Sequence, residues 1–320
     1  MNSGYRASGN SPAIEIRGLR KEYGDTVAVD GLDLVVPRGS TYALLGPNGS
    51  GKTTTIRTLL RIQEPDAGEV LVLGEEPGPE VRDRIGYLPE ERGLYPRMKV
   101  HDVLTFLAEL KGIPPKVSRP RIDGWLDRVG LAERAEDQVQ GLSKGMQQKL
   151  QFIAAVVHEP EVVILDEPFS GLDPINQQAL REILGEIRQA ERTILFSTHI
   201  IEHAERLCDH VCILSRGRAV VQGELGRVKR EHGGRHVGLT LDPWTPEAVA
   251  AVRAAPEAAR VHEDGHAIEL TLADGADPRA LLSRLVQGGV GLIRFEVVEP
   301  SLQQVFIERV GRPIEEGALV

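Results

Sequence analysis

The chain lacks the features that mark several classes of protein. Only two of its 320 residues are cysteines, Cys208 and Cys212, which excludes a disulfide framework and suits a reducing cytosol. No apolar run approaches the roughly 18 residues that a membrane-spanning helix needs, and residues 1–12 have no apolar core of a secretory signal. We therefore expect a cytoplasmic chain that would reach the inner face of a membrane only as a peripheral subunit.

Basic residues are not in excess either. The chain has 38 Lys and Arg against 47 Asp and Glu, a net charge of −9, which gives no support to a nucleic-acid partner. It shows no internal repeat and no low-complexity tract. A length of 320 residues fits two domains. We expect flexible tails at 1–12 and 313–320, a main domain over 13–232 and a smaller domain over 236–312.

Apolar patterning predicts an α/β main domain with three parts. Alternating residues indicate an antiparallel β subdomain, short apolar runs joined by a helix indicate a parallel core, and a 3.6-residue period indicates a helical subdomain over about 95–158. Strands are expected at 14–19, 32–36, 41–45, 70–73, 85–88, 162–165, 193–196 and 219–222. A helix is expected at 174–190, and another helix, from about residue 100, should end at Pro114-Pro115.

The C-terminal segment after Gly233-Gly234 predicts a small α+β domain. Strands are expected at 237–241, 259–263, 267–272 and 291–298, with helices at 246–254, 277–287 and 301–310. The first six elements follow the order β-α-β-β-α-β, which is that of the ferredoxin-like fold.

One glycine-rich segment carries the first chemical signal. The pattern Gly46-x-x-x-x-Gly51-Lys52-Thr53 lies between an apolar strand and a helical pattern, where backbone N–H groups and a helix N-terminus can cradle phosphates. Lys52 would reach the β- and γ-phosphates of ATP, and the Thr53 hydroxyl would bind Mg²⁺. The residues expected to hold the nucleotide here are Gly46, Pro47, Asn48, Gly49, Ser50, Gly51, Lys52, Thr53 and Thr54.

A second signal is an apolar strand, 162–165, that ends in Asp166 and Glu167. Asp166 would hold Mg²⁺ and Glu167 would polarise the water that attacks the γ-phosphate. Many strands end in solvated acids, so this pattern gains its meaning from the phosphate loop before it.

With further motifs, residues 14–225 resemble the ABC ATPases. Residues 142–148 (LSKGMQQ) resemble the family's signature, 170–173 (SGLD) its D-loop, and 197–199 (STH) the segment with its switch histidine. Tyr23 stands where the family stacks an aromatic ring on adenine. The resemblance implies ATP and Mg²⁺ as cofactors and a dimer that encloses two ATP molecules.

The same resemblance implies particular roles for residues that also have plainer explanations. Ser143 and Gly145 would meet the γ-phosphate held by the opposite subunit, but Ser143 also suits a helix N-cap. Asp173 would contact the partner subunit or serve only as a turn residue. His199 would contact the γ-phosphate as part of the catalytic machinery, or be an N-cap or core histidine.

Three positions depart from the family pattern. Lys144 and Met146 replace a glycine and a glutamine of the signature, and Glu90 stands where a glutamine usually helps bind Mg²⁺. Glu90 could serve as a metal ligand, although its charge would alter the rate of turnover.

Two less specific segments resemble ATPases of ABC-2-type exporters, including sodium and drug efflux systems. They are residues 90–98 (EERGLYPRM) and 299–306 (EPSLQQVF). Leu94, Tyr95 and Met98 would form an apolar surface for a membrane subunit, or would pack inside the helical subdomain.

A rival pattern, His199-x-x-Glu202-His203, matches an inverted zinc-protease helix. In that interpretation the two histidines bind Zn²⁺ and Glu202 is the base. Cys208 and Cys212, four residues apart, are better explained as small buried residues than as ligands.

The sequence therefore predicts an ATPase that powers an ABC-type exporter as its peripheral nucleotide-binding subunit. The expected partners are a second copy, or a second ATPase subunit, and an integral membrane permease. The alternatives are a soluble ATP-driven switch and a regulatory ATP binder with weak turnover. Sodium, a drug, a lipid and a peptide all remain open as cargo.

Overall fold

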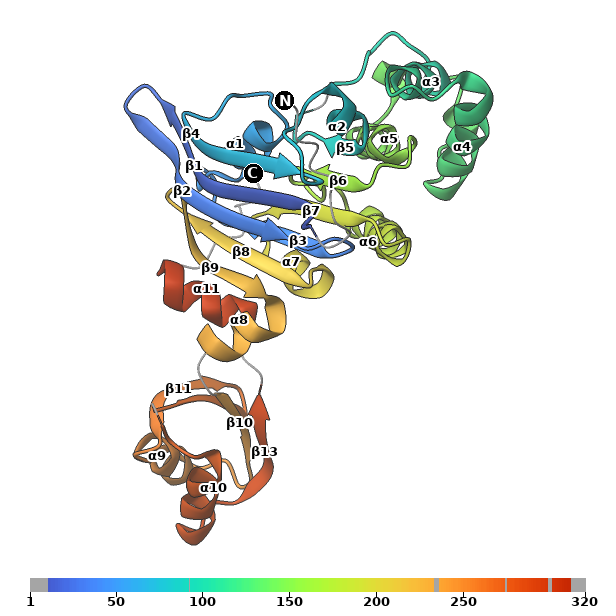
Figure 1. Cartoon of the computed structure of the whole chain (residues 1–320). Helices are drawn as coiled ribbons and strands as arrows, with labels where there is room; N and C mark the ends of the chain where they lie inside the picture. The colour runs from blue at the N-terminus through green and yellow to red at the C-terminus, as the bar shows by residue number, and fades with distance from the viewer. Residues whose placement is uncertain (1–10, 92, 233–235, 274, 299–300, 312–320) are drawn as a thin grey trace. The chain divides into compact units, whose positions relative to one another are not determined.

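The computed structural model describes residues 11–91, 93–232, 236–273, 275–298 and 301–311 (Figure 1). It divides into two compact units, with the division between Gly223 and Glu224. The predicted tails lie almost wholly outside the described residues, as do Gly233-Gly234 and the first two residues of the 299–306 segment. No helix in the described ranges is both long and apolar enough to cross a bilayer.

The first unit begins with an antiparallel sheet, as predicted, and its strand order is β2-β1-β4. Its strands are β1 (Ile14–Tyr23), β2 (Thr26–Val36) and β4 (Ala67–Val72). The hairpin between β1 and β2 turns at Gly24, whose φ of +57° suits a residue without Cβ. Both strands extend well beyond the predicted 14–19 and 32–36, because their pairing continues to Tyr23 and Thr26.

A six-stranded sheet of order β5-β6-β7-β3-β8-β9 forms the core of this unit. Its strands are β3 (Thr41–Leu45), β5 (Ile85–Leu88), β6 (Val162–Leu165), β7 (Thr193–Thr198), β8 (His210–Ser215) and β9 (Arg218–Glu224). The pairs β5–β6, β6–β7, β7–β3 and β3–β8 are parallel, so the carboxyl ends of β6, β7 and β3 meet at one edge. Strand β8 was not among the predicted elements.

Helices surround this core. They are α1 (Lys52–Leu59), α2 (Pro79–Asp83), α3 (Val100–Leu110), α4 (Pro115–Arg128), α5 (Lys144–Val156), α6 (Pro174–Gln189) and α7 (Ile201–Leu207). Short 3₁₀ turns cover Ala132–Arg134 and Val139–Gly141. Figure 1 shows α3, α4 and α5 grouped beside β5 and β6, as the predicted helical subdomain. Helix α3 ends before the proline pair, and α4 then begins at Pro115.

The second unit contains a four-stranded antiparallel sheet of order β11-β12-β10-β13. Its elements are α8 (Leu225–His232), β10 (His236–Leu241), α9 (Pro246–Arg253), β11 (Ala258–Asp264), β12 (Ala267–Leu272), α10 (Pro278–Gln287), β13 (Leu292–Val298) and α11 (Leu302–Val310). A buried apolar cluster joins the sheet to α9 and α10. The order β-α-β-β-α-β and this strand arrangement confirm the ferredoxin-like prediction. Helix α8 lies against α11, within the same unit.

Candidate functional site

The phosphate loop connects β3 to α1, and two of its glycines are required by close packing. A Cβ added to Gly46 would lie 2.4 Å from the Leu214 carbonyl oxygen, and one added to Gly51 would lie 2.6 Å from that of Ala28. Gly51 also has a φ of +105°, which side chains rarely allow. Gly51 caps α1 without any side-chain hydrogen bond, so the first N–H groups of the helix remain available to an anion.

Lys52 is buried at the base of this loop, with 5% of its surface exposed. Its ammonium group donates to the carbonyl oxygens of Gly46 at 2.8 Å and Pro47 at 3.3 Å. The same nitrogen lies 3.4 Å from Oε1 of Glu167. The lysine predicted to bind phosphate and the glutamate predicted to act as base are therefore in direct contact.

A network at the ends of β6 and β7 holds Asp166. Its Oδ1 accepts from the Ser197 hydroxyl at 2.6 Å and from the Thr53 hydroxyl at 3.3 Å. The Ser197 oxygen in turn accepts from the Glu167 N–H at 2.8 Å. The side chain of Asp166 is buried, and burial raises the pKa of this carboxyl despite both hydrogen bonds. From the sequence, Ser197 was noted only as part of the 197–199 motif. Its hydrogen bonds to Asp166 and Glu167 were not predicted.

Glu167 has an unusual backbone. Its φ of +48° lies in the left-handed region, which costs a residue with a side chain on the order of 1–3 kcal/mol. Its carboxylate lies between two cationic or titratable partners, Lys52 on Oε1 and the Nδ1 atom of His199, 3.0 Å from Oε2. His199 follows β7 and precedes the N-cap of α7. The fold therefore brings Lys52, Glu167 and His199 together from three separate segments.

The acidic side of the site fits a hard divalent cation. Oδ2 of Asp166 is buried and has no hydrogen-bond partner among the described residues, and the Thr53 hydroxyl lies beside the other carboxylate oxygen. Burial, with the charges of Asp166 and Glu167, raises the pKa of the Glu90 carboxyl. No group of three His, Cys, Asp or Glu suited to a metal occurs in the described ranges. A Mg²⁺ site does not require such a group, because the ion commonly takes one or two carboxylates and completes its shell with water and substrate phosphates.

An open cleft of about 460 Å³ joins the phosphate loop to the β1–β2 hairpin, within the usual size of a small-molecule site. Its lining residues are Tyr23, Thr26, Val27, Ala28, Asn48, Gly49, Gly51, Lys52, Thr53, Thr54, Glu90 and Glu167. Tyr23 is 44% exposed at the end of β1, and its hydroxyl donates to Gln63. The structure thus places Tyr23 and Thr54 at the same cleft as the phosphate loop.

Ser143, Gly145 and Asp173 do not line this cleft in the described part of the chain. Ser143 caps α5 and accepts from the Met146 N–H at 3.3 Å, and Asp173 caps α6 and accepts from the Asn176 N–H at 2.9 Å. Ser143 has the N-cap role of its plainer explanation, whereas Asp173, whose plainer explanation was a turn residue, is also an N-cap; both side chains are exposed. A Cβ on Gly145 would lie 3.8 Å from the Asn176 side chain, so the starts of α5 and α6 adjoin.

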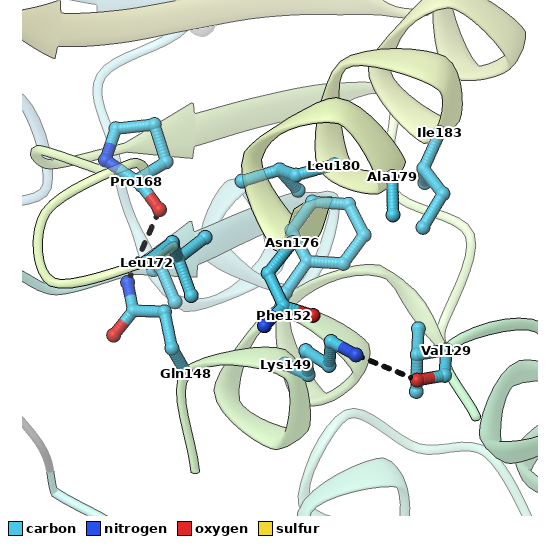
Figure 2. A pocket seen from close by; sticks show the side chains of 11 residues that line it. Val129, Gln148, Lys149, Phe152, Pro168, Leu172, Asn176, Ala179, Leu180 and Ile183 are labelled. Atoms are coloured by element: carbon cyan, nitrogen blue, oxygen red, sulfur yellow. Dashed lines mark hydrogen bonds between the residues drawn. The ribbon is translucent and has the colours of Figure 1, made fainter. Parts of the chain in front are cut away.

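Figure 2 shows the apolar seam where α5 packs against α6, around Phe152, Leu172 and Leu180. A polar contact lies beside this seam. Gln148, on α5, donates from Nε2 to the carbonyl oxygen of Pro168 at 3.4 Å, and Pro168 is the residue after Glu167. The helix that begins at the signature motif is therefore bonded to the loop that carries Glu167. This link is long-range in sequence and was not predicted.

The zinc-protease interpretation is wrong. His199 lies before α7 rather than on it, and its ring contacts Glu167. His203 is 3% exposed and its ring centroid lies 4.3 Å from that of Phe169, while Glu202 pairs with Arg206. Burial lowers the pKa of His203 to about 4, as expected for a neutral core histidine. The two cysteines are buried and unpaired.

The proposed apolar surface near residue 95 is only partly exposed. Tyr95 is 50% exposed and its ring meets Phe106 edge-on, with centroids 5.6 Å apart. Leu94 and Met98 are partly buried. The segment both packs on the helical subdomain and leaves one aromatic ring accessible.

Known proteins resemble this chain over almost its whole length. An uncharacterised ABC transporter ATP-binding protein of Bacillus subtilis is 41% identical over 302 residues, which cover 94% of this chain and all of the relative. The chain belongs to the ABC transporter ATP-binding proteins. As a member of this family it binds ATP and is an ATPase.

Other similarities agree with this membership. The ABC transporter family profile matches residues 29–170, and the profile described as "ATP-binding protein DrrA1-3-like, C-terminal domain" matches 223–310. The Nod factor export ATP-binding protein I of Ralstonia nicotianae is 35% identical, over 96% of this chain and 97% of the relative. A solved ATP-binding subunit of an ABC transporter has a TM-score of 0.65 at 35% identity, covering 69% of this ABC ATPase and 93% of that chain.

Proposed function

We propose that this ABC ATPase is the peripheral subunit that powers a membrane exporter, together with an integral membrane permease. Support comes from full-length similarity to a protein named for Nod factor export and from the DrrA1-3-like C-terminal match. A further relative by structure, cbiO1 from Clostridium perfringens, is described as part of the transporter complex cbiONQ, with a TM-score of 0.60 and 28% identity over 68% of this chain and 90% of that one. The cytoplasmic face of the membrane is the place proposed for this subunit.

The domain limits that accompany this proposal follow the compact units. The ATPase domain would run from residue 13 to 223, and α8 would belong with the C-terminal domain. Support comes from the packing of α8 on α11 and from the second family match, which begins at residue 223. This moves the limit from the 232 expected from the sequence.

The observation that carries the catalytic proposal is the 3.4 Å contact between Lys52 and Glu167. Lys52 contacts this carboxylate and two loop carbonyls. The β- and γ-phosphates would draw the ammonium away and leave Oε1 of Glu167 free to accept a proton from the attacking water. His199, on Oε2, would fix the carboxylate and contact the γ-phosphate.

Mg²⁺ would be held by Thr53, Asp166 and Glu90. When bound, it offsets the negative charge that develops on the transferred phosphoryl group. Support comes from the buried, unpartnered oxygen of Asp166 and from the close approach of the Thr53 hydroxyl. Tyr23 would stack on adenine at the other end of the cleft.

We also propose that two subunits share each ATP. Ser143 and Asp173 are exposed and lie outside the cleft of their own chain. They would reach a nucleotide only in the cleft of a second chain. The start of α5 suits a phosphate, because its first turn has no acidic residue and Lys144 adds a positive charge. A head-to-tail homodimer, or a pair with a second ATPase subunit, would place each Ser143 and Gly145 at the partner's γ-phosphate.

The test is Mg²⁺-dependent ATP hydrolysis measured against protein concentration. We expect activity per subunit to rise with concentration for the wild type and to be lost in Ser143→Arg. Ser283→Arg, at an exposed position on α10, is the matched control and should retain activity. Activity that is independent of concentration and of Ser143 would overturn the shared site, and Mg²⁺-independent activity would overturn the metal assignment.

A further inference from the structure

Strand β13 (Leu292–Val298) is the outer strand of the four-stranded sheet, and no described strand pairs with its outward side. Its two most exposed apolar residues are Ile293, at 69%, and Val297, at 56%. An edge strand presents unpaired N–H and C=O groups, which form a template for another strand. Exposed apolar residues on such an edge favour pairing further.

The strand at the opposite edge of the same sheet, β11 (Ala258–Asp264), is better protected than β13 against pairing with another strand. The ladders of both edge strands have a single register shift at the start, between Ala258 and Arg260 in β11 and between Leu292 and Arg294 in β13, so the edges differ in their charges. Strand β11 carries several charged or titratable residues, and one of them, Glu263, pairs with Arg253 of α9. Bulges and charges are the usual devices that prevent edge pairing. Strand β13 has only two charged residues, Arg294 and Glu296, and its ladder to β10 is regular from Arg294 to Val298.

The sequence of β13 is complementary to itself when run antiparallel. Pairing centred on Phe295 places Ile293 opposite Val297 of a second copy, and Arg294 opposite Glu296. A two-fold axis repeats both pairs, so the strand supplies two apolar pairs and two ion pairs from four residues. Directly opposed residues in such a ladder have Cβ atoms about 4.5–5.5 Å apart, close enough for both kinds of pair to interact.

Among the described residues, the two charged side chains of β13 form an ion pair only with each other. Arg294 and Glu296 share one face of β13 and pair with each other, with 66% and 48% of their side chains exposed. Such an exposed pair contributes little to stability, so both groups are free to take new partners. A parallel in-register pairing would instead oppose like charges, which favours the antiparallel arrangement.

We infer that the second unit joins two copies of this chain through β13, so that two four-stranded sheets continue as one of eight strands. This contact is distinct from the proposed ATP-sharing dimer, because it involves no residue of the nucleotide site and requires no nucleotide. Its consequence would be a raised effective concentration of one ATPase domain for the other, which favours their association when ATP binds.

The experiment is sedimentation equilibrium of the full chain without nucleotide. Arg294→Glu and Glu296→Arg each convert two opposite-charge pairs into like-charge pairs, so the dimer should weaken about tenfold. In an equimolar mixture the first variant carries only carboxylates at these positions and the second only guanidinium groups. The mixture should therefore recover wild-type affinity as a heterodimer.

Two controls separate this contact from general effects. Arg260→Glu, on the protected edge strand β11, should leave the wild-type dimer unchanged. Thermal unfolding should show that every variant remains folded, since the substituted side chains are exposed. Val297→Lys, which places a charge in the apolar pair, should weaken the dimer as well.

A wild-type chain that stays monomeric without nucleotide would overturn the inference. So would a dimer that resists both charge reversals, or a mixture no tighter than the single variants. A wild-type chain that lacks this dimer but still shows concentration-dependent hydrolysis would refute only the β13 contact. A β13 dimer that persists while hydrolysis ignores Ser143 would refute only the ATP-sharing proposal.

Discussion

The two groups of residues assigned to ATP differ in how complete they are within one chain. At the carboxyl end of β6, charged groups are buried, Glu167 has a left-handed backbone, and an Asp166 oxygen lacks a partner among the described residues. At the starts of α5 and α6, Ser143 and Asp173 are exposed and already bonded as helix caps. The first group has a buried carboxylate oxygen that a bound ligand would pair with. The polar side chains of the second group are already hydrogen-bonded and exposed, so they are stable without a ligand.

The largest expected effect is at the buried group. Glu167→Gln keeps the shape of the side chain but removes the base, so turnover should fall about 10²- to 10⁴-fold while ATP still binds. Single-turnover hydrolysis and binding of a fluorescent ATP analogue measure the two quantities separately. Glu182→Gln, an exposed position on α6, is the control and should behave as wild type. Normal turnover in Glu167→Gln would remove this residue from the mechanism.

Acid should destabilise the folded chain at His203, which packs beside the buried group. Burial lowers the pKa of His203, beside Phe169, from 6.5 to about 4, so the unfolded chain binds more protons than the folded chain between these values. Its contribution to stability is therefore complete above pH 6.5 and is lost as pH falls towards 4. This contribution is of order 1–3 kcal/mol.

Urea unfolding at a series of pH values measures it. In His203→Gln, which cannot gain a proton, the free energy of unfolding should fall less steeply over this window. His158, whose pKa burial also lowers to about 4, should add a second contribution that His203→Gln leaves in place. An unchanged pH profile in the variant would mean that the pKa of His203 is the same in the folded and the unfolded chain.

A smaller effect is expected at Gln148, which joins the helix that begins after Ser143 to the loop that carries Glu167. Gln148→Leu removes the bond from α5 to the Pro168 carbonyl, so Glu167 should be held less firmly. We expect a loss of kcat of roughly fivefold, the equivalent of one hydrogen bond, with little change in KM. Gln178→Leu, at an exposed position on α6, is the control. A change confined to KM would place the role of Gln148 in ATP binding instead.

How much of these regions the sequence could predict depends on how far apart in the sequence the contacting residues lie. The phosphate loop and the Asp166-Glu167 pair follow local rules for glycine and for strand ends, and the C-terminal elements alternate clearly enough to predict their topology. Strand β8 was missed although 211–214 is a short apolar run. Helix α4 lies inside the predicted helical subdomain, but its bounds were not predicted, because Pro120 and many charges interrupt its apolar period.

Contacts between distant segments were beyond sequence reasoning. The bridge from Ser197 to Asp166 joins residues 31 apart, and that from Gln148 to Pro168 joins residues 20 apart. Neither the apolar period nor the composition of these segments specifies which hydroxyl or amide group will form a hydrogen bond with the distant segment. Packing of β6 against β7, and of α5 against α6, decides these partners.

The most direct test of the shared site is complementation between two inactive variants. Lys52→Ala disables the phosphate loop and Ser143→Arg disables the signature, so neither alone should hydrolyse ATP. In an equimolar mixture half of the dimers are heterodimers with one intact site of two, which predicts about a quarter of wild-type activity if the sites act independently. No recovery on mixing would contradict a site built from two subunits.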